Sequence, residues 1–339
     1  MTEIHREIIE HPNAWTALTA NKSTFSRQLA ADELAALDRL LAATRAHDPV
    51  RITRAQFEHP MVDALMKEVR DTILSGCGVV ILTGLTRERY SDEDFKRIYW
   101  GLGTHLGRGL EQSRSGDMLG LVQEEEENPT VRGYRSSAAL GMHTDAFEIV
   151  GLMCVQRAET GGESSLASAL TIHNEILRSR PELLAPLYEG FYFTLQELQF
   201  TERPTTAEKV PVFCNVDGMV SCNYAASYMR RAAELRRIPF PAELDEALKY
   251  FDATATRTDI RAEFMLEPGD IMLWNNYTHL HSRRAFKNSP SRKRLLLRLW
   301  LEVTGGRPVT PAFTLRGRSF EWIYGAPSAA ASAAAPASH

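Results

Sequence analysis

The sequence predicts an α+β fold with a mainly β core and flanking helices. Residues 141–304 follow a strand-rich pattern, with helical interruptions near 168–179 and 241–253. The N-terminal part of the chain instead carries apolar residues mostly at helical spacing. Hydrophobic residues make up 44% of the 339 positions, so the chain can bury a large core.

Two helices are predicted near the N-terminus. Four leucines at helical spacing define one over residues 30–46, and Asp48-Pro49 ends it. Apolar residues repeat every four positions over 61–73, and Gly76 follows where a C-cap is expected.

A strand and a third helix follow. Residues 78–84 form a β-branched run bounded by glycines, which indicates a buried strand. Ser-Asp-Glu-Asp at 91–94 has the form of a capping box and precedes apolar residues at helical spacing, so a helix is expected to begin there. Further strands are predicted at 264–266, 271–274 and 294–303.

We expect three segments along the chain. Residues 1–55 are predicted to be a helical N-terminal extension, residues 56–324 the main domain, and residues 325–339 a disordered tail rich in Ala, Ser and Pro. Residues 107–140 show little periodicity, and a long loop just before a candidate site is typical of a lid.

Charge and cysteine usage exclude several classes of protein. The net charge of −4 argues against a phosphate-backbone binder, so no nucleic acid is expected as a partner. No apolar run reaches the roughly 18 residues of a membrane span, and the N-terminus lacks a signal-peptide pattern. We expect a cytoplasmic protein, because its four cysteines are dispersed and form no CxxC pair: Cys77, Cys154, Cys214 and Cys222.

The candidate site begins with His143-Thr-Asp145. In a strand, residues two apart point to the same face about 6.6 Å apart, so the imidazole and the carboxylate can reach one metal ion. A second imidazole comes from His279 or His281, which lie on one strand-period face, so geometry alone excludes neither. Two histidines and one carboxylate on one face of iron(II) form a facial triad with three open positions.

Two arginines follow on a predicted strand. Arg294 and Arg298 share one face with Leu296 and Trp300. Guanidinium groups are costly to bury unless anions meet them, and a dicarboxylate would neutralise one through a bidentate pair. Pairing with protein carboxylates or solvent is the alternative interpretation.

The order and spacing of these pieces resemble the taurine-dioxygenase (TauD/TfdA) family of iron(II)/2-oxoglutarate oxygenases. The similarity runs over about residues 78–302 and includes the entry strand, the Gly-Gly-Glu-Ser stretch at 161–164 and the Asn-rich lead into the second histidine. An arginine thirteen residues after that histidine, and another four further on, complete it.

The resemblance implies a double-stranded β-helix, a jelly-roll relative, in which the metal ligands are His143, Asp145 and His281. The family's Asn-x4-His-x-Arg spacing selects His281 over His279. The resemblance also assigns the distal carboxylate of 2-oxoglutarate to Arg294 and Ser164.

Four further residues are predicted to contact the substrate. The resemblance places Arg298 where some members meet an anionic substrate group, while Gln112, Ser113 and Asn223 are predicted for the pocket wall from their positions in the lid loop or near strands. Ala139, together with Gln112 and Ser113, departs from what a taurine-using enzyme would carry, so taurine is not expected.

The implied reaction couples O2 and 2-oxoglutarate, with release of succinate and CO2, to hydroxylation of a small organic substrate; desaturation and epoxidation stay open. The alternatives are a cupin-like zinc or manganese hydrolase or isomerase that needs no 2-oxoglutarate, and a non-catalytic small-molecule binding module. A homo-oligomer is compatible with the sequence. His105 and His173 fall in helical patterns and are predicted to be surface or cap residues.

Overall fold

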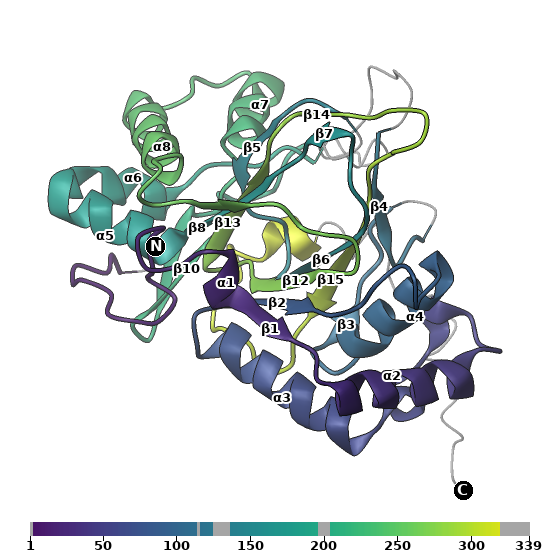
Figure 1. Cartoon of the computed structure of the whole chain (residues 1–339). Helices are drawn as coiled ribbons and strands as arrows, with labels where there is room; N and C mark the ends of the chain where they lie inside the picture. Colours follow the sequence, from purple (N-terminus) through teal and green to yellow (C-terminus); the bar gives the residue numbers. More distant parts are fainter. Residues whose placement is uncertain (1–2, 114–115, 125–135, 196–203, 319–339) are drawn as a thin grey trace, which may run out of the picture.

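We describe a computed structural model of the chain, covering residues 3–113, 116–124, 136–195 and 204–318. The predicted tail at 325–339 therefore lies outside the described residues, as do residues 114–115 and 125–135 of the predicted lid loop at 107–140. Within the described residues the core consists of two β-sheets, and helices pack outside them (Figure 1).

The larger sheet has seven described strands in the order β1-β2-β12-β6-β15-β3, with β4 also paired to β15. All of its pairs are antiparallel except β1–β2. Its strands are β1 (Ser26–Gln28), β2 (Val79–Thr83), β3 (Arg108–Gly109), β4 (Gly120–Val122), β6 (Ile149–Gln156), β12 (Ile271–Asn275) and β15 (Leu295–Glu302).

The smaller sheet has the order β11-β8-β13-β5 and is antiparallel throughout. Two further antiparallel pairs, the hairpin β10–β9 and the long-range pair β14–β7, form separate two-stranded sheets. These strands are β5 (Leu140–His143), β7 (Thr160–Gly161), β8 (Ser164–Ser168), β9 (Phe213–Val216), β10 (Met219–Cys222), β11 (Ala262–Phe264), β13 (His279–Arg283) and β14 (Phe286–Lys287).

The helices fall into two groups on opposite sides of the strands (Figure 1). Helices α2 to α4 cover the outer face of the larger sheet, and α5 to α8 pack beside the smaller sheet. The short α1 belongs to neither group, because its Phe25 packs in the interior between the sheets. The bounds are α1 (Lys22–Phe25), α2 (Ala31–Thr44), α3 (Pro60–Leu74) and α4 (Asp92–Gly103), then α5 (Ala169–Ser179), α6 (Leu184–Glu189), α7 (Ala226–Arg236) and α8 (Ala242–Ala255).

Strand β2 shows how the core is divided. Val79 and Ile81 face the interior between the two sheets, whereas Val80 and Leu82 face the helices α2, α3 and α4. Because side chains alternate along a strand, a strand covered on both faces is apolar at every position. The apolar run at 78–84 is therefore confirmed as a buried strand of the larger sheet.

Most predicted elements are confirmed within a few residues. The helices expected at 30–46 and 61–73 are α2 and α3, and Ser91 caps α4 through a capping box. The predicted extension at 1–55 contributes β1 to the larger sheet, so this segment is part of the folded body. The helix α7 was not predicted.

Burial settles the prediction made for His173. His173 on α5 is fully buried and its Nε2 lies 3.1 Å from the Tyr188 hydroxyl, so the prediction of a surface or cap residue is wrong. The inner face of α5 packs against other members of the second helical group, and the His173 ring contacts Phe213 with 5.0 Å between ring centroids. None of the described helices combines the length and apolar character needed to cross a membrane.

Candidate active site

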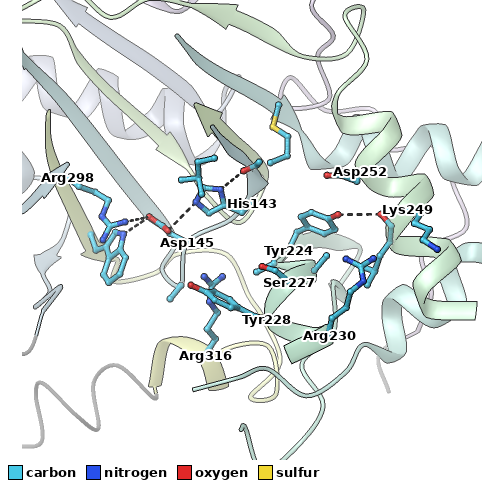
Figure 2. Close-up of a pocket in the computed structure, with 18 residues that line it drawn as sticks. His143, Asp145, Tyr224, Ser227, Tyr228, Arg230, Lys249, Asp252, Arg298 and Arg316 are labelled. Carbon is cyan, nitrogen blue, oxygen red and sulfur yellow. Dashed lines mark hydrogen bonds and ion pairs between the residues drawn. The ribbon is translucent and has the colours of Figure 1, made fainter. Parts of the chain in front are cut away.

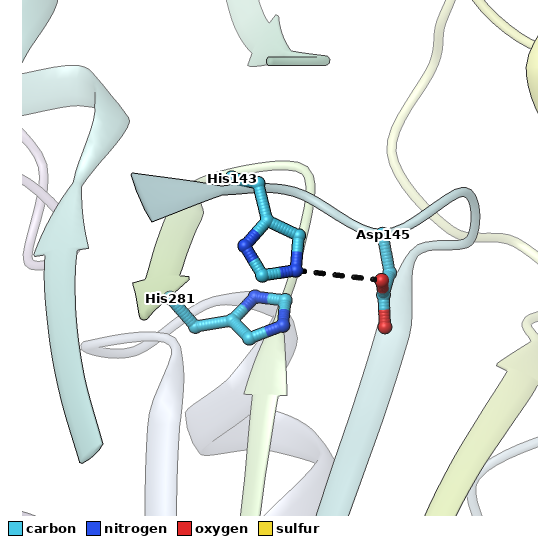
Figure 3. Close-up of side chains that lie close together, drawn as sticks. All are labelled: His143, Asp145 and His281. Atoms are coloured by element: carbon cyan, nitrogen blue, oxygen red, sulfur yellow. Dashed lines mark ion pairs between the residues drawn. The ribbon is translucent and has the colours of Figure 1, made fainter. Parts of the chain in front are cut away.

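Three side chains from the smaller sheet and the loop that leaves it converge (Figure 3). His143 ends β5, Asp145 follows two residues later, and His281 lies opposite His143 in the β5–β13 ladder. The two imidazole ring centroids are 4.1 Å apart, and one ligand atom from each residue lies within 4.8 Å of the others. This is the one such cluster of potential metal ligands in the described part of the chain.

The backbone at Asp145 is fixed by a side chain from a distant segment. Asn276 accepts a hydrogen bond from the Asp145 amide at 2.9 Å through Oδ1. Its Nδ2 donates to the carbonyls of Asp145 and Phe147 at 3.0 and 2.8 Å. Asn276 is fully buried, so these bonds are shielded from water and hold the loop in which Asp145 lies.

The two carboxylate oxygens of Asp145 have different neighbours. Its Oδ1 lies 3.9 Å from Nε2 of His143, whereas its Oδ2 accepts a 2.7 Å hydrogen bond from the Trp300 indole. Nη1 of Arg298 lies 3.6 Å from the same Oδ2. One oxygen therefore faces the histidines and the other is held by β15 of the larger sheet.

The orientation of His143 is also set by a hydrogen bond. Its Nδ1 lies 2.9 Å from the Gly141 carbonyl, which can only accept, so Nδ1 carries the proton and Nε2 presents a lone pair toward Asp145. Nδ1 of His281 is buried without a hydrogen-bond partner among the described residues.

Electrostatics keep the three groups in the protonation states that a metal requires. Burial lowers the pKa of His143 and, more strongly, that of His281, so both imidazoles are neutral near pH 7. Burial raises the pKa of Asp145, but the charge of Arg298, electrostatic interactions with the two imidazole rings and the Trp300 hydrogen bond outweigh it. They hold that pKa well below its usual range.

The residues fit a metal ion. Bonds from a metal to histidine nitrogen or carboxylate oxygen are about 2.0–2.2 Å long, so ligand atoms on one face of an ion, at about 90° to one another, lie about 3 Å apart. The three ligand atoms lie within 4.8 Å of one another, so a bound ion would draw them together by at most about 2 Å, which small side-chain rotations supply. Two neutral imidazoles and one carboxylate are the donor set of a facial triad.

His279 occupies a different environment from His281. It is fully buried, stacks on Trp15 at 5.3 Å between ring centroids, and has Nδ1 3.1 Å from the Asn275 carbonyl. It is outside the cluster formed by His281 with His143 and Asp145.

Arg294 is buried beside Ser164, in a small space that also includes Gly162 and Cys154. Its guanidinium lies 5.1 Å from the Phe286 ring centroid, and its Nη1 has no hydrogen-bond partner among the described residues. Burial lowers the pKa of Arg294 to about 10. The space measures about 10 Å³, room for about one water molecule, so a carboxylate that binds there requires nearby side chains to move.

A cavity of about 790 Å³ opens beside His143 and Asp145 (Figure 2). Its deep end is lined by Arg298, Trp300 and Arg316, and its outer wall comes from the helices α7 and α8. The wall residues that sequence reasoning missed include Arg316 from the C-terminal segment and, on the helical side, Tyr224, Tyr228, Arg230, Lys249 and Asp252.

Two of the three remaining pocket predictions, Gln112 and Asn223, lie behind this wall, and Ser113 does not. Gln112 accepts a 2.8 Å hydrogen bond from Arg298 Nε, and Asn223 lies 3.4 Å from Arg316 Nη1, so each contacts an arginine that lines the cavity. Ser113 is hydrogen-bonded to Asp117 and lies apart from the described cavity lining.

The two histidines and the carboxylate that converge beside a cavity, together with a buried Arg294, are features of a non-haem iron(II) dioxygenase that uses 2-oxoglutarate. The sequence matches the family model described as "Taurine catabolism dioxygenase TauD, TfdA family" over residues 45–300. The chain belongs to this family, and iron(II), 2-oxoglutarate and O2 are its cofactor and co-substrates. A cupin-like hydrolase or a non-catalytic binding module is not favoured.

Curated relatives agree with this assignment. The chain is 30% identical over 255 residues to FR-33289 synthase of Streptomyces rubellomurinus, an alignment that covers 72% of this chain and 74% of that protein. It is 28% identical over 269 residues to the taurine hydroxylase-like protein SAT17 of Stachybotrys chartarum, covering 73% and 67%. A uridine-5'-phosphate dioxygenase of Streptomyces sp. is 28% identical over 204 residues, covering 52% and 71%.

Solved structures confirm the jelly-roll fold. Asparagine oxygenase in complex with Fe(II), 3-hydroxyasparagine and succinate superposes with a TM-score of 0.66 at 15% identity, covering 82% of this chain and 93% of that one. The non-haem iron oxygenase OrfP in complex with Fe and α-ketoglutaric acid gives 0.60 at 15% identity, covering 81% and 93%.

Proposed function

We propose that His143, Asp145 and His281 bind iron(II), and that Arg294 and Ser164 bind the distal carboxylate of 2-oxoglutarate. The enzyme hydroxylates a small anionic organic substrate held in the cavity beside the triad, with release of succinate and CO2. The observation that carries this proposal is the convergence of the three ligand atoms within 4.8 Å, next to a cavity that reaches the surface.

Iron(II) with 2-oxoglutarate supplies the activation of O2 that oxidises a C–H bond. The protein supplies binding and orientation. Asp145 offers one oxygen to the metal, because Trp300 and Arg298 hold the other. His143 offers Nε2, because its Nδ1 proton is fixed on the Gly141 carbonyl. Three protein ligands on one side leave the other side of the ion for co-substrates.

Arg294 is suited to orient the co-substrate. It is a buried cation without a carboxylate partner among the described residues, and burying an uncompensated charge costs several kcal/mol, on the order of 3–5. A carboxylate that reaches Arg294 offsets that cost through a bidentate, charge-assisted pair. Ser164 lies in the same space and adds a hydroxyl.

An anionic substrate is supported by the deep end of the cavity, which Arg298 lines. Gln112 takes part indirectly, because its Oε1 accepts from Arg298 Nε while its Nε2 donates to the Arg298 carbonyl. A reducing cytoplasm is supported by the four free cysteines.

The test is a single-turnover measurement with enzyme in excess over 2-oxoglutarate. Protein loaded with iron(II) and 2-oxoglutarate without oxygen is mixed with air-saturated buffer, and succinate is counted over hours, so that slow uncoupled turnover is detected. We expect succinate to depend on iron and to fall by at least about 100-fold in Asp145→Ala. Equal succinate from metal-free protein, or from Asp145→Ala, would contradict the proposal.

A further inference from the structure

Thr144 lies between His143 and Asp145, two of the three proposed metal ligands, and is fully buried. Its amide, its carbonyl and its hydroxyl are each hydrogen-bonded to a residue that lines the cavity. The peptide that separates the two ligands is therefore joined directly to the substrate side of the site.

Two of these bonds reach the backbone of Tyr224. The Thr144 amide donates to the Tyr224 carbonyl at 2.8 Å, and the Tyr224 amide donates to the Thr144 hydroxyl oxygen at 2.8 Å. In an antiparallel ladder the second acceptor would be the backbone carbonyl. Here the hydroxyl takes that place, which requires a hydroxyl side chain at residue 144 and leaves the Thr144 carbonyl for another donor.

That donor is Arg316, whose Nη1 lies 2.7 Å from the Thr144 carbonyl oxygen. The Arg316 guanidinium also lies 5.1 Å from the ring centroid of Tyr228, in the first turn of α7 (Figure 2). Tyr224 leads into the same helix through Ala225, its N-cap residue. Both routes from Thr144 therefore end at the beginning of α7, which forms part of the outer cavity wall.

Helix α7 has few interactions of its own that hold it in place. Ala225 has no side-chain oxygen that could accept from the amides of the first turn. The buried residues of α7 are Met229, Ala232 and Ala233, so little apolar area is removed from water. An element with few buried apolar contacts opens locally at low free energy. The order of α7 therefore depends on how firmly the chain is held where it enters the helix, at Tyr224.

A bound ion changes how firmly Thr144 is held. The ligand atoms of the triad lie within 4.8 Å of one another, and an ion draws them closer together. It then fixes the side chains on both sides of Thr144, so the peptide between them loses freedom. Opening of α7 must break hydrogen bonds to that peptide, and it becomes rarer once the peptide is rigid.

We propose that Thr144 is a positioning residue: its hydrogen bonds to Tyr224 and Arg316 couple occupancy of the metal site to the order of α7. This inference rests on the proposed triad. The loaded enzyme holds the wall of its substrate cavity in place, whereas α7 opens more often in the metal-free protein. The coupling is reciprocal, so holding α7 closed tightens metal binding by the same factor.

The experiment is hydrogen–deuterium exchange of the full chain with and without Mn(II), followed by mass spectrometry of peptides from α7. Peptides from α3, which packs outside the larger sheet, are the internal reference. We expect Mn(II) to slow exchange in α7 of the wild-type protein by at least about fivefold and to leave α3 unchanged. Asp145→Ala, at the same Mn(II) concentration, should show no slowing in α7.

Thr144→Val keeps the shape of the side chain and removes the hydroxyl. The slowing of α7 should fall by at least half, because the Tyr224 amide loses its acceptor. Thr144→Ser keeps the hydroxyl and should retain the slowing. Each variant is measured at a Mn(II) concentration that saturates it, as checked by calorimetry. Each is also compared with its own metal-free form, so a general loss of stability does not produce the effect.

Thr171→Val is the matched control. Thr171 is also buried, and its hydroxyl donates a 2.6 Å hydrogen bond to the Trp15 carbonyl, away from the described cavity lining. This variant should keep the wild-type slowing. A loss in Thr171→Val as large as that in Thr144→Val would assign the effect to general destabilisation and overturn the coupling.

Three further results would overturn the inference: a smaller change in α7 of a wild-type protein that binds Mn(II), full slowing in Thr144→Val, or full slowing in Asp145→Ala. If Thr144→Val does not fold, Arg316→Met decides, because it removes the other link between Thr144 and α7. That variant should also lower the slowing, and full slowing contradicts the coupling. A wild-type protein that fails to bind Mn(II) contradicts the proposed triad itself, and the coupling with it.

Discussion

Trp300 holds the outer oxygen of Asp145: its indole Nε1 donates a 2.7 Å hydrogen bond to Oδ2, away from the histidines. Trp300 lies on β15 of the larger sheet, whereas Asp145 follows β5 of the smaller one. Hydrogen bonds of this kind to a metal-binding carboxylate fix its orientation and basicity.

Trp300→Phe removes this bond and keeps an aromatic ring in place. We expect the affinity for iron(II), or for Mn(II) as a stable substitute, to fall about 10- to 100-fold. Trp274→Phe is the matched control, because the Trp274 indole is equally buried but its Nε1 has no hydrogen-bond partner among the described residues. Equal loss of metal affinity in both variants, measured by calorimetry, would assign the effect to packing.

The two histidines of β13 give opposite expectations. His281→Ala should lose metal binding and all iron-dependent succinate formation. His279→Ala should keep metal binding but lower the free energy of unfolding by about 2–4 kcal/mol, because a fully buried ring that stacks on Trp15 is removed. Metal titration and urea unfolding of both variants check this. Metal loss in His279→Ala with retention in His281→Ala reverses the assignment.

Arg294→Ala tests the co-substrate site by stability as well as by activity. Without 2-oxoglutarate the variant should be as stable as wild type or more so, because a buried cation with an unpartnered Nη1 is removed. The rise in melting temperature that 2-oxoglutarate gives the Mn(II)-loaded wild-type protein should be lost at concentrations near 100 times the wild-type Kd, where the stabilisation is about 2.7 kcal/mol.

Arg284→Ala is the control for Arg294→Ala, since Arg284 is exposed and pairs with Glu263 at the surface. It should keep the full 2-oxoglutarate effect. A normal thermal response in Arg294→Ala would show that the co-substrate binds elsewhere.

Stability should depend on pH through His173. Burial, with a smaller contribution from His5, lowers the pKa of His173 to about 3 from its ordinary value of 6.5, and its ring faces Tyr188 and Phe213. The unfolded chain binds the proton first as pH falls, so the stabilising contribution is complete above about pH 6.5. It is lost progressively below that value, by about 1.4 kcal/mol per pH unit, until the folded state also binds the proton.

His173→Gln isolates this contribution. We expect the free energy of unfolding, measured by urea titration near pH 7, 6 and 5, to fall less steeply with decreasing pH in the variant than in the wild type. The difference in slope corresponds to the one proton that His173 binds in the unfolded chain. Part of the pH dependence remains in both proteins, because the pKa of other buried histidines, such as His279, is also lowered. Parallel pH profiles would mean that the His173 ring takes up its proton without unfolding.

The chemistry of the site was predictable from short motifs, although strand geometry accounts for only part of it. The cross-strand register sets His281 opposite His143, whereas Asp145 lies in the loop after β5 and is placed by hydrogen bonds from Asn276, not by strand period as expected. Strand geometry placed Arg298 and Trp300 on one face of β15, although it could not indicate that both meet Asp145.

The cavity wall was much harder to predict. Helix α7 is rich in Arg and Ala, with buried residues at only Met229, Ala232 and Ala233, so its apolar pattern is weak. Arg316 has no local signal at all, since the burial of an arginine depends on tertiary contacts such as the Thr144 carbonyl. Sequence reasoning therefore found the residues that short motifs mark and missed those fixed by packing between distant segments.

The division of the site between the two sheets has a consequence for how the enzyme loses activity. His143 and His281 lie on the smaller sheet, while the partners of Asp145, Trp300 and Arg298, lie on β15 of the larger one. We therefore expect a change that separates the two sheets, such as heating or an oversized interior side chain, to weaken metal binding before the chain unfolds. Gradual inactivation should therefore begin as leakage of metal from protein that still looks native.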